Sequence, residues 1–87
     1  MSGSNQITGR QIAAARALAG VGQAELADWS SVSIPTLRRM EASVGAAAGL
    51  PNNVAAVRRA LEGVGVIFVD ENGEGPGVRM RKAGHVD

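Results

Sequence analysis

The chain has 87 residues, with nine Lys and Arg against eight Asp and Glu, so its formal net charge is only +1. That length suits one domain with a small core, which would gain stability by pairing with a second copy. A charge so close to zero excludes a strongly basic, non-specific nucleic-acid coat.

Cysteine is absent, which excludes disulfides and thiolate metal sites, and the lone His85 cannot form a metal site by itself. No set of Ser, His and Asp residues converges, so we expect neither an enzyme nor a cofactor. No apolar run approaches the roughly 18 residues that cross a bilayer, and no signal-like segment follows the start. We therefore expect a cytoplasmic protein without a membrane partner.

The first predicted helix covers residues 9–19. Thr8 and Gln11 have the spacing of a capping box, and Gly20 stands where a left-handed C-cap favours glycine. The apolar stripe of this helix is expected to contain Ile12, Ala15, Leu18 and Ala19.

Two short helices joined by a tight turn are predicted next, over residues 23–30 and 34–41. Gly22 precedes the first helix as a possible cap, Ser33 is a good N-cap for the second, and Pro35 falls in its first turn. The residues expected to be buried are Leu26, Ala27, Ser30, Leu37 and Met40. This is the layout of a helix-turn-helix whose second helix lies in the DNA major groove.

The segment over residues 42–50 has no charge, and we expect a short helical turn within residues 44–48. A helix capped by an Asn is predicted to follow Pro51 and to end at residues 62–63. Its apolar face is expected to contain Val54, Val57 and Leu61.

A β-hairpin is predicted at the end of the chain. Residues 64–69 are apolar and β-branched, as in a strand buried on both faces, and residues 70–73 have turn chemistry. Residues 78–81 alternate as a half-buried strand. The ends, residues 1–6 and 82–87, are expected to be flexible.

These elements predict a mainly α fold with four or five helices over residues 7–63 and a β-hairpin over residues 64–81. The hairpin either packs on the helices of its own chain or pairs across a two-fold axis to form a homodimer. The candidate dimer residues are Val66, Phe68, Val78 and Met80.

The chain resembles the small Cro/C1-type (XRE family) DNA-binding regulators of bacteria and mobile elements. The most specific part is Gln23-Ala-Glu-Leu-Ala, followed by Val32-Ser33, Leu37 and Met40-Glu41. The resemblance covers about Thr8 to Leu61, and the hairpin is similar to the ending of some small bacterial members.

This resemblance implies a homodimeric transcriptional regulator. It would bind a palindromic double-stranded DNA operator by placing the helix over residues 34–41 in the major groove. The positions that it places against base edges are Ile34, Pro35, Thr36 and Arg39. Those that it places along the DNA backbone are Gln23, Ser33 and Arg38. It also implies a partly buried ion pair between Arg16 and Glu41.

Three features depart from the family pattern. Ser31 replaces the usual turn glycine, and Ala42 replaces the usual Asn or Gly after Glu41. Residues 42–50 lack the usual basic residues, so phosphate contacts there would have to come from backbone N–H groups.

Several of these residues have a structural interpretation as well as a functional one. Arg38 and Arg39 form either a solvated face or a grip on guanine, and Ile34 either packs beside its cap or contacts a thymine methyl. Trp29 either packs under the hairpin or contacts a second chain. The basic residues of the tail, either solvated or close to flanking phosphates, are Arg79, Arg81 and Lys82.

Two other functions fit the same pattern. The protein would be the antitoxin of a toxin–antitoxin pair if the hairpin or Trp29 gripped a toxin. It would be an antiactivator if the helix-turn-helix bound a protein instead of DNA, and this alternative predicts no salt-sensitive DNA binding.

Overall fold

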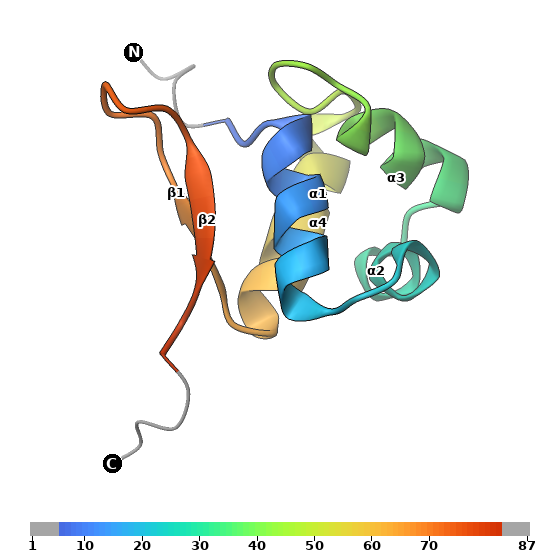
Figure 1. Ribbon diagram of the computed structural model, residues 1–87. Helices are drawn as coiled ribbons and strands as arrows, with labels where there is room; N and C mark the ends of the chain where they lie inside the picture. Colours follow the sequence, from blue (N-terminus) through green and yellow to red (C-terminus); the bar gives the residue numbers. More distant parts are fainter. Residues whose placement is uncertain (1–5, 83–87) are drawn as a thin grey trace.

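A computed structural model describes residues 6–82 of the protein. The described part is a small, mainly helical domain of four helices and one antiparallel hairpin. These elements are α1 (Gly9–Ala19), α2 (Gln23–Ser30), α3 (Ile34–Glu41), α4 (Pro51–Gly63), β1 (Val66–Val69) and β2 (Gly77–Met80). Figure 1 shows α1 and α4 in the middle, with the hairpin on one side and α2 and α3 on the other. The ends that we expected to be flexible lie almost wholly outside the described residues.

The capping signals of α1 act as predicted. Thr8 Oγ1 accepts a hydrogen bond from the Gln11 N–H at 3.0 Å, and Gln11 Oε1 accepts one from the Thr8 N–H at 2.8 Å. Gly20 ends the helix in the left-handed region, at φ 72°. The expectation for Leu18 is wrong: its side chain is 50% exposed, because the core lies under Ile12 and Ala15 and Leu18 points away from them.

The turn between α2 and α3 has the predicted boundaries and the predicted caps. Gly22 precedes α2, and its N–H is bound by the Glu25 carboxylate at 3.1 Å. Ser33 Oγ accepts a hydrogen bond from the Thr36 N–H at 3.1 Å. Ser31 adopts φ 58°, the left-handed conformation that glycine usually supplies.

Ser31→Gly is expected to stabilise the fold by about 0.5–1 kcal/mol. Relief of the left-handed strain gains roughly 1–2 kcal/mol, and the extra freedom of glycine in the unfolded chain takes back about half. Urea denaturation followed by circular dichroism measures the difference. Gly20→Ser, at a second left-handed helix end, is the reverse substitution and should destabilise the protein. A loss of stability in Ser31→Gly would contradict this interpretation.

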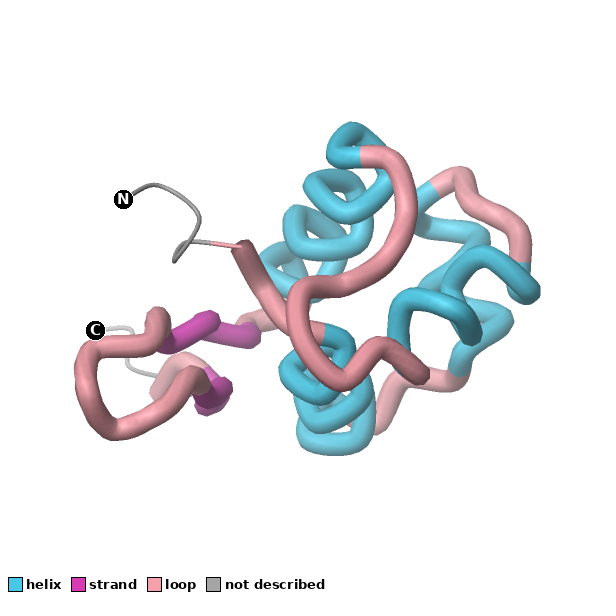
Figure 2. The backbone as a smooth tube through the Cα atoms, turned by 90° about the horizontal axis from the view of Figure 1, so that it is seen from above, coloured by secondary structure: helices cyan, strands magenta, loops and turns pink. Residues whose placement is uncertain are grey.

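The segment between α3 and α4 contains no helical turn, so that prediction is wrong. Backbone bonds tie it to the start of α1 and the residues just before it: the Gly9 N–H donates to Gly45 O at 3.1 Å, and the Ala47 N–H donates to Ile7 O at 3.0 Å. Ser43 Oγ accepts a further bond, from the Ala48 N–H at 2.9 Å. Because these groups bond across the domain, they cannot form a local helix. Figure 2 draws the loop between α3 and α4 and the segment before α1 in pink.

Helix α4 starts at least two positions earlier than a cap at Asn52 or Asn53 would allow. Pro51 is the first helical residue and Leu50 is the N-cap, without a side-chain hydrogen bond, so no Asn caps this helix. Proline suits that position because its fixed φ is helical and its missing N–H would be unpaired there anyway. On the inner face Val57 and Leu61 are buried, and Val54 is partly buried against the same core.

The hairpin packs on the helices of its own chain. β1 pairs with β2 in the register Val66–Met80, Ile67–Arg79, Phe68–Val78 and Val69–Gly77. Val66 and Phe68 are 1% and 7% exposed and belong to the main core, whereas their neighbours in β1 are half-buried. The strand is therefore buried on one face only, and it begins at residue 66 instead of residue 64.

This packing corrects the list of dimer candidates. The side chains of Val66 and Phe68 are buried in the core of their own chain, so they cannot contact a second chain. Val78 is partly buried against the same core, and only Met80, at 38%, is substantially exposed.

Gln11 joins the hairpin to α1. Its side chain is buried, and Nε2 donates to Val69 O at 3.2 Å and to Gly77 O at 2.9 Å. One side chain thus caps a helix with its oxygen and binds both strands with its nitrogen. From the sequence, Gln11 was predicted only to cap α1.

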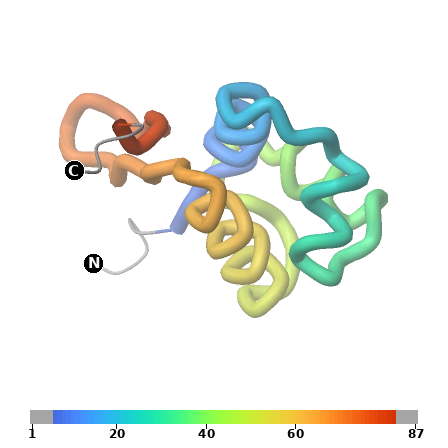
Figure 3. Tube along the Cα trace, turned by 90° about the horizontal axis from the view of Figure 1, so that it is seen from below, coloured from blue at the N-terminus to red at the C-terminus, as the bar shows by residue number. Residues whose placement is uncertain are grey.

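Packing under the hairpin, one of the two interpretations of Trp29, is wrong. Trp29 lies on α2, which is separated from the hairpin by α1 and α4 (Figure 3). The side chain is 48% exposed. The reason is that α2 turns Leu26, Ala27 and Ser30 toward the core, and Trp29 falls on the other side of this short helix.

Candidate nucleic-acid interface

Helix α3 divides cleanly into a buried face and an exposed one. Leu37 and Met40 are fully buried. The exposed side chains fall at positions i, i+1, i+4 and i+5, so they share one face of the helix. They are Ile34, Pro35, Arg38 and Arg39.

The start of α3 is built around two hydroxyl groups. Ser33 Oγ donates to Thr36 Oγ1 at 2.8 Å while it accepts from the Thr36 N–H. Ser33 is exposed and Thr36 is half-buried. Both side chains therefore take part in the N-terminal cap of α3. Their hydroxyl groups lie beside the exposed face of this helix.

The end of α3 is fixed by the expected ion pair. Arg16 Nε lies 2.8 Å from Glu41 Oε2, and Arg16 Nη2 lies 3.1 Å from Glu41 Oε1. Only 8% of the Glu41 side chain and 25% of that of Arg16 are exposed. The hydrogen bond that Arg16 donates to Glu41 raises the pKa of Arg16, so its guanidinium group stays charged.

Gln23 extends this pair into a network that crosses from α2 to α3. Its Nε2 donates to Glu41 Oε1 at 3.1 Å, and its Oε1 accepts a long hydrogen bond of 3.4 Å from Arg38 Nε. A residue predicted for the DNA backbone is thus also a brace between the two helices. The sequence holds no signal for this role, because 18 residues separate Gln23 from Glu41.

A hollow of about 420 Å³ opens beside the exposed face of α3. Thr36 and Arg39 line one side, and Asn53, in the first turn of α4, lines the other. From the sequence, an Asn after Pro51 was predicted only as a helix cap. Together with the positive end of the α4 dipole, the Asn53 amide makes this hollow suitable for an anion such as a phosphate.

Positive charge on this side of the molecule comes from few residues. Arg38 and Arg39 are exposed, and Glu41, the acidic residue of α3, is already paired with Arg16. Arg79, Arg81 and Lys82 are exposed on the hairpin side, which faces away from α3 (Figure 1). The tail cations and α3 therefore form two separate surfaces.

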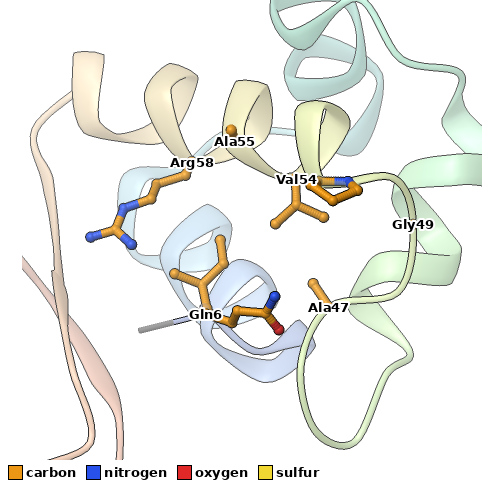
Figure 4. A pocket seen from close by; sticks show the side chains of 8 residues that line it. Gln6, Ala47, Gly49, Val54, Ala55 and Arg58 are labelled. Carbon is orange, nitrogen blue, oxygen red and sulfur yellow. The ribbon is translucent and has the colours of Figure 1, made fainter. Parts of the chain in front are cut away.

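A smaller hollow of about 210 Å³ lies between the loop after α3 and the first half of α4 (Figure 4). Its walls are mostly aliphatic, with Ile7, Ala47 and Val54 among them. Arg58 turns away from it, bonds Glu62 at 3.0 Å and lies over the ring of Phe68 at 5.2 Å. The hollow thus lacks a charged group pointing into it.

No protein-family model matches the chain, and no curated protein matches it. Within residues 6–82 no three His, Cys, Asp or Glu side chains gather as a metal site. None of the helices in that range has the length and apolar character needed to cross a membrane.

Proposed function

We propose that the protein binds double-stranded DNA sequence-specifically as a small transcriptional regulator of the Cro/C1 type, with α3 in the major groove. The observation that carries this proposal is the two-sided nature of α3. Its inner face is fully buried, and its outer face presents two arginines and two apolar side chains on a rigidly braced helix. A helix held in that way can enter a groove without losing its support.

Base contacts are assigned to the outer face of α3. Arg39 reaches guanine O6 and N7, a bidentate contact worth roughly 1–3 kcal/mol of discrimination. Ile34 contacts a thymine methyl, and Pro35 and Thr36 lie against neighbouring base edges. Arg38 is held by a single long hydrogen bond, so it can turn from Gln23 to a phosphate at little cost.

Backbone contacts are assigned to the ends of the helices. Gln23 at the start of α2 and Ser33 before α3 lie beside the exposed face, and each offers polar groups to a phosphate. The hollow that contains Asn53 adds a third contact, which compensates for the lack of basic residues over residues 42–50.

Two copies are needed for firm binding, because one copy carries so little positive charge. We infer a homodimer with its two α3 helices about 34 Å apart on a palindrome. The outer edge of β1 is the surface we favour for pairing, since Val66–Val69 contains no charged residue that would oppose its own copy.

The test is a fluorescence titration against the DNA upstream of the protein's own gene, with a scrambled duplex beside it and two salt concentrations. Arg39→Ala should weaken specific binding by about 10- to 100-fold, the equivalent of one lost bidentate contact. Arg79→Ala is the matched control, because it removes the same charge on the side away from α3.

A binding plateau at two chains per palindromic duplex would support the dimer. Equal losses of DNA affinity in Arg39→Ala and Arg79→Ala would mean that only the net charge matters. This result would overturn the assignment of α3 as the helix that contacts the bases. Absence of salt-sensitive binding to either duplex would replace DNA by a protein partner, as in the antiactivator alternative.

A further inference from the structure

A second surface lies on the hairpin side of the molecule, between α1 and β2. A hollow of about 470 Å³ runs there, with Arg10 and Ala14 of α1 on one wall and Gly77 and Val78 of β2 on the other. Val44 stands over one end and is 78% exposed. This surface is formed by elements that the proposed DNA interface does not use.

Beyond the hollow, α1 reaches Leu18 and β2 reaches Met80. α1 and β2 start together at the Gln11–Gly77 hydrogen bond and run in the same direction (Figure 1). Seven helical residues and three strand residues both advance about 10 Å, so Leu18 and Met80 reach the same level. Both are among the large exposed apolar side chains of the described residues, at 50% and 38%.

The strand wall of this groove is an open sheet edge. The Arg81 N–H donates to Gly65 O at 2.7 Å, which makes Gly65–Arg81 a hydrogen-bonded pair. Hydrogen-bonded pairs alternate with non-bonded pairs in an antiparallel ladder. The main-chain N–H and C=O groups of Val78 and Met80 therefore point away from β1. Within residues 6–82 these groups have no hydrogen-bond partner outside the hairpin.

The side chains beside this edge define what would bind to it. Val78 and Met80 lie on the inner face of β2, and Val78 shares the hollow with Ala14 of α1. Arg79 and Arg81 alternate with them on the outer face and are exposed. A strand added to β2 would place apolar residues opposite the first set and acidic residues opposite the second.

A second copy of β2 fits this edge poorly. Antiparallel pairing of two β2 edges places Val78 opposite Met80 of the other copy and Arg79 directly opposite its own counterpart. Like charges in that position destabilise a sheet. Elsewhere in the chain no stretch alternates acidic with apolar residues, so the occupant comes from another protein.

We propose that the β2 edge and the facing side of α1 form a docking groove for an extended partner segment in which acidic and apolar residues alternate. The segment adds a third strand to the hairpin. Main-chain hydrogen bonds to Val78 and Met80 hold it, and Arg79 and Arg81 select its acidic side chains.

The experiment uses the full chain labelled with ¹⁵N and the peptide Glu-Val-Glu-Leu-Glu-Val-Glu with blocked ends. Saturating peptide should slow hydrogen exchange at the Val78 and Met80 amides by about tenfold or more, because these N–H groups become hydrogen-bonded. The Arg79 amide is the internal control, since it already points to β1 and should change little. The charge-reversed peptide, with Lys in place of Glu, should have no effect.

A double variant, Arg79→Glu with Arg81→Glu, tests the role of the two charges because it should gain binding to the lysine peptide. It should lose the acidic peptide and protect the same two amides with the lysine peptide, which an unfolded variant could not do. Peptide binding without protection of these amides would mean that only charge attracts the peptide, and this would overturn the proposal. The absence of any peptide binding would overturn it as well. Protection that rises with protein concentration alone would assign the edge to a second copy and also overturn it.

Discussion

Gly9→Ala is expected to destabilise the protein by about 3 kcal/mol or more. A Cβ atom at this position would lie 2.2 Å from Met40 O and 2.5 Å from Ser43 O. Both atoms belong to the main chain at the end of α3 and in the following loop, so they cannot rotate away. Overpacking in a tight site costs roughly 1–3 kcal/mol, and a clash with two backbone carbonyls falls at the upper end of that range.

The matched control for this prediction is Gly45→Ala. No atom lies within 4 Å of a Cβ at Gly45, and its φ is outside the left-handed region. Its effect should stay within about 0.5 kcal/mol, as for other unconstrained surface positions. Urea denaturation of both variants measures the difference. Equal stabilities would show that α1 and the end of α3 do not approach as closely as described.

Val66→Lys is expected to unfold the protein or to cost more than about 4 kcal/mol, because an unpaired ammonium group would replace a buried methyl pair. Val66 is 1% exposed, and its side chain lies in the core with Leu61 and Phe68. The lysine stem cannot reach solvent without lifting β1 from the helices. Thermal denaturation followed by circular dichroism measures this loss.

Ile67→Lys is the control on the same strand. Ile67 is half-buried on the outer face of the hairpin, where a lysine can extend into water, so this variant should remain folded. A folded, monomeric Val66→Lys variant would have the opposite meaning. That result would mean that, in the unsubstituted protein, the hairpin does not pack on its own helices but pairs with a second chain across a dimer axis.

The four helices were predictable because their signals are local. The Thr8–Gln11 capping box, Gly20 and Ser33 satisfy backbone groups of residues close by in the chain, so the same bonds form in any tertiary setting. The inner faces of α2 and α3 followed from helical periodicity alone. The Arg16–Glu41 pair was expected from family resemblance, and its two residues do meet.

The predictions that failed depended on contacts between distant segments. Whether residues 44–48 form a turn depends on bonds to Ile7 and Gly9, which no local pattern reveals. Strand composition alone could not decide whether Val66 faces its own core or a second chain, because an apolar strand suits both. Trp29 was assigned to the hairpin because the relative positions of α2 and the hairpin could not be read from the sequence.

The sequence by itself thus determined where α1, α2 and α3 begin and end and which residues of α3 share its outer face, because these depend on groups a few residues apart. Tertiary structure decided the rest. It made Gly9 a point of close approach, joined Gln11 to both strands, braced Gln23 against Glu41 and left the edge of β2 open. Each of these depends on atoms brought together from opposite parts of the chain, where packing and geometry select the partner and periodicity carries no information.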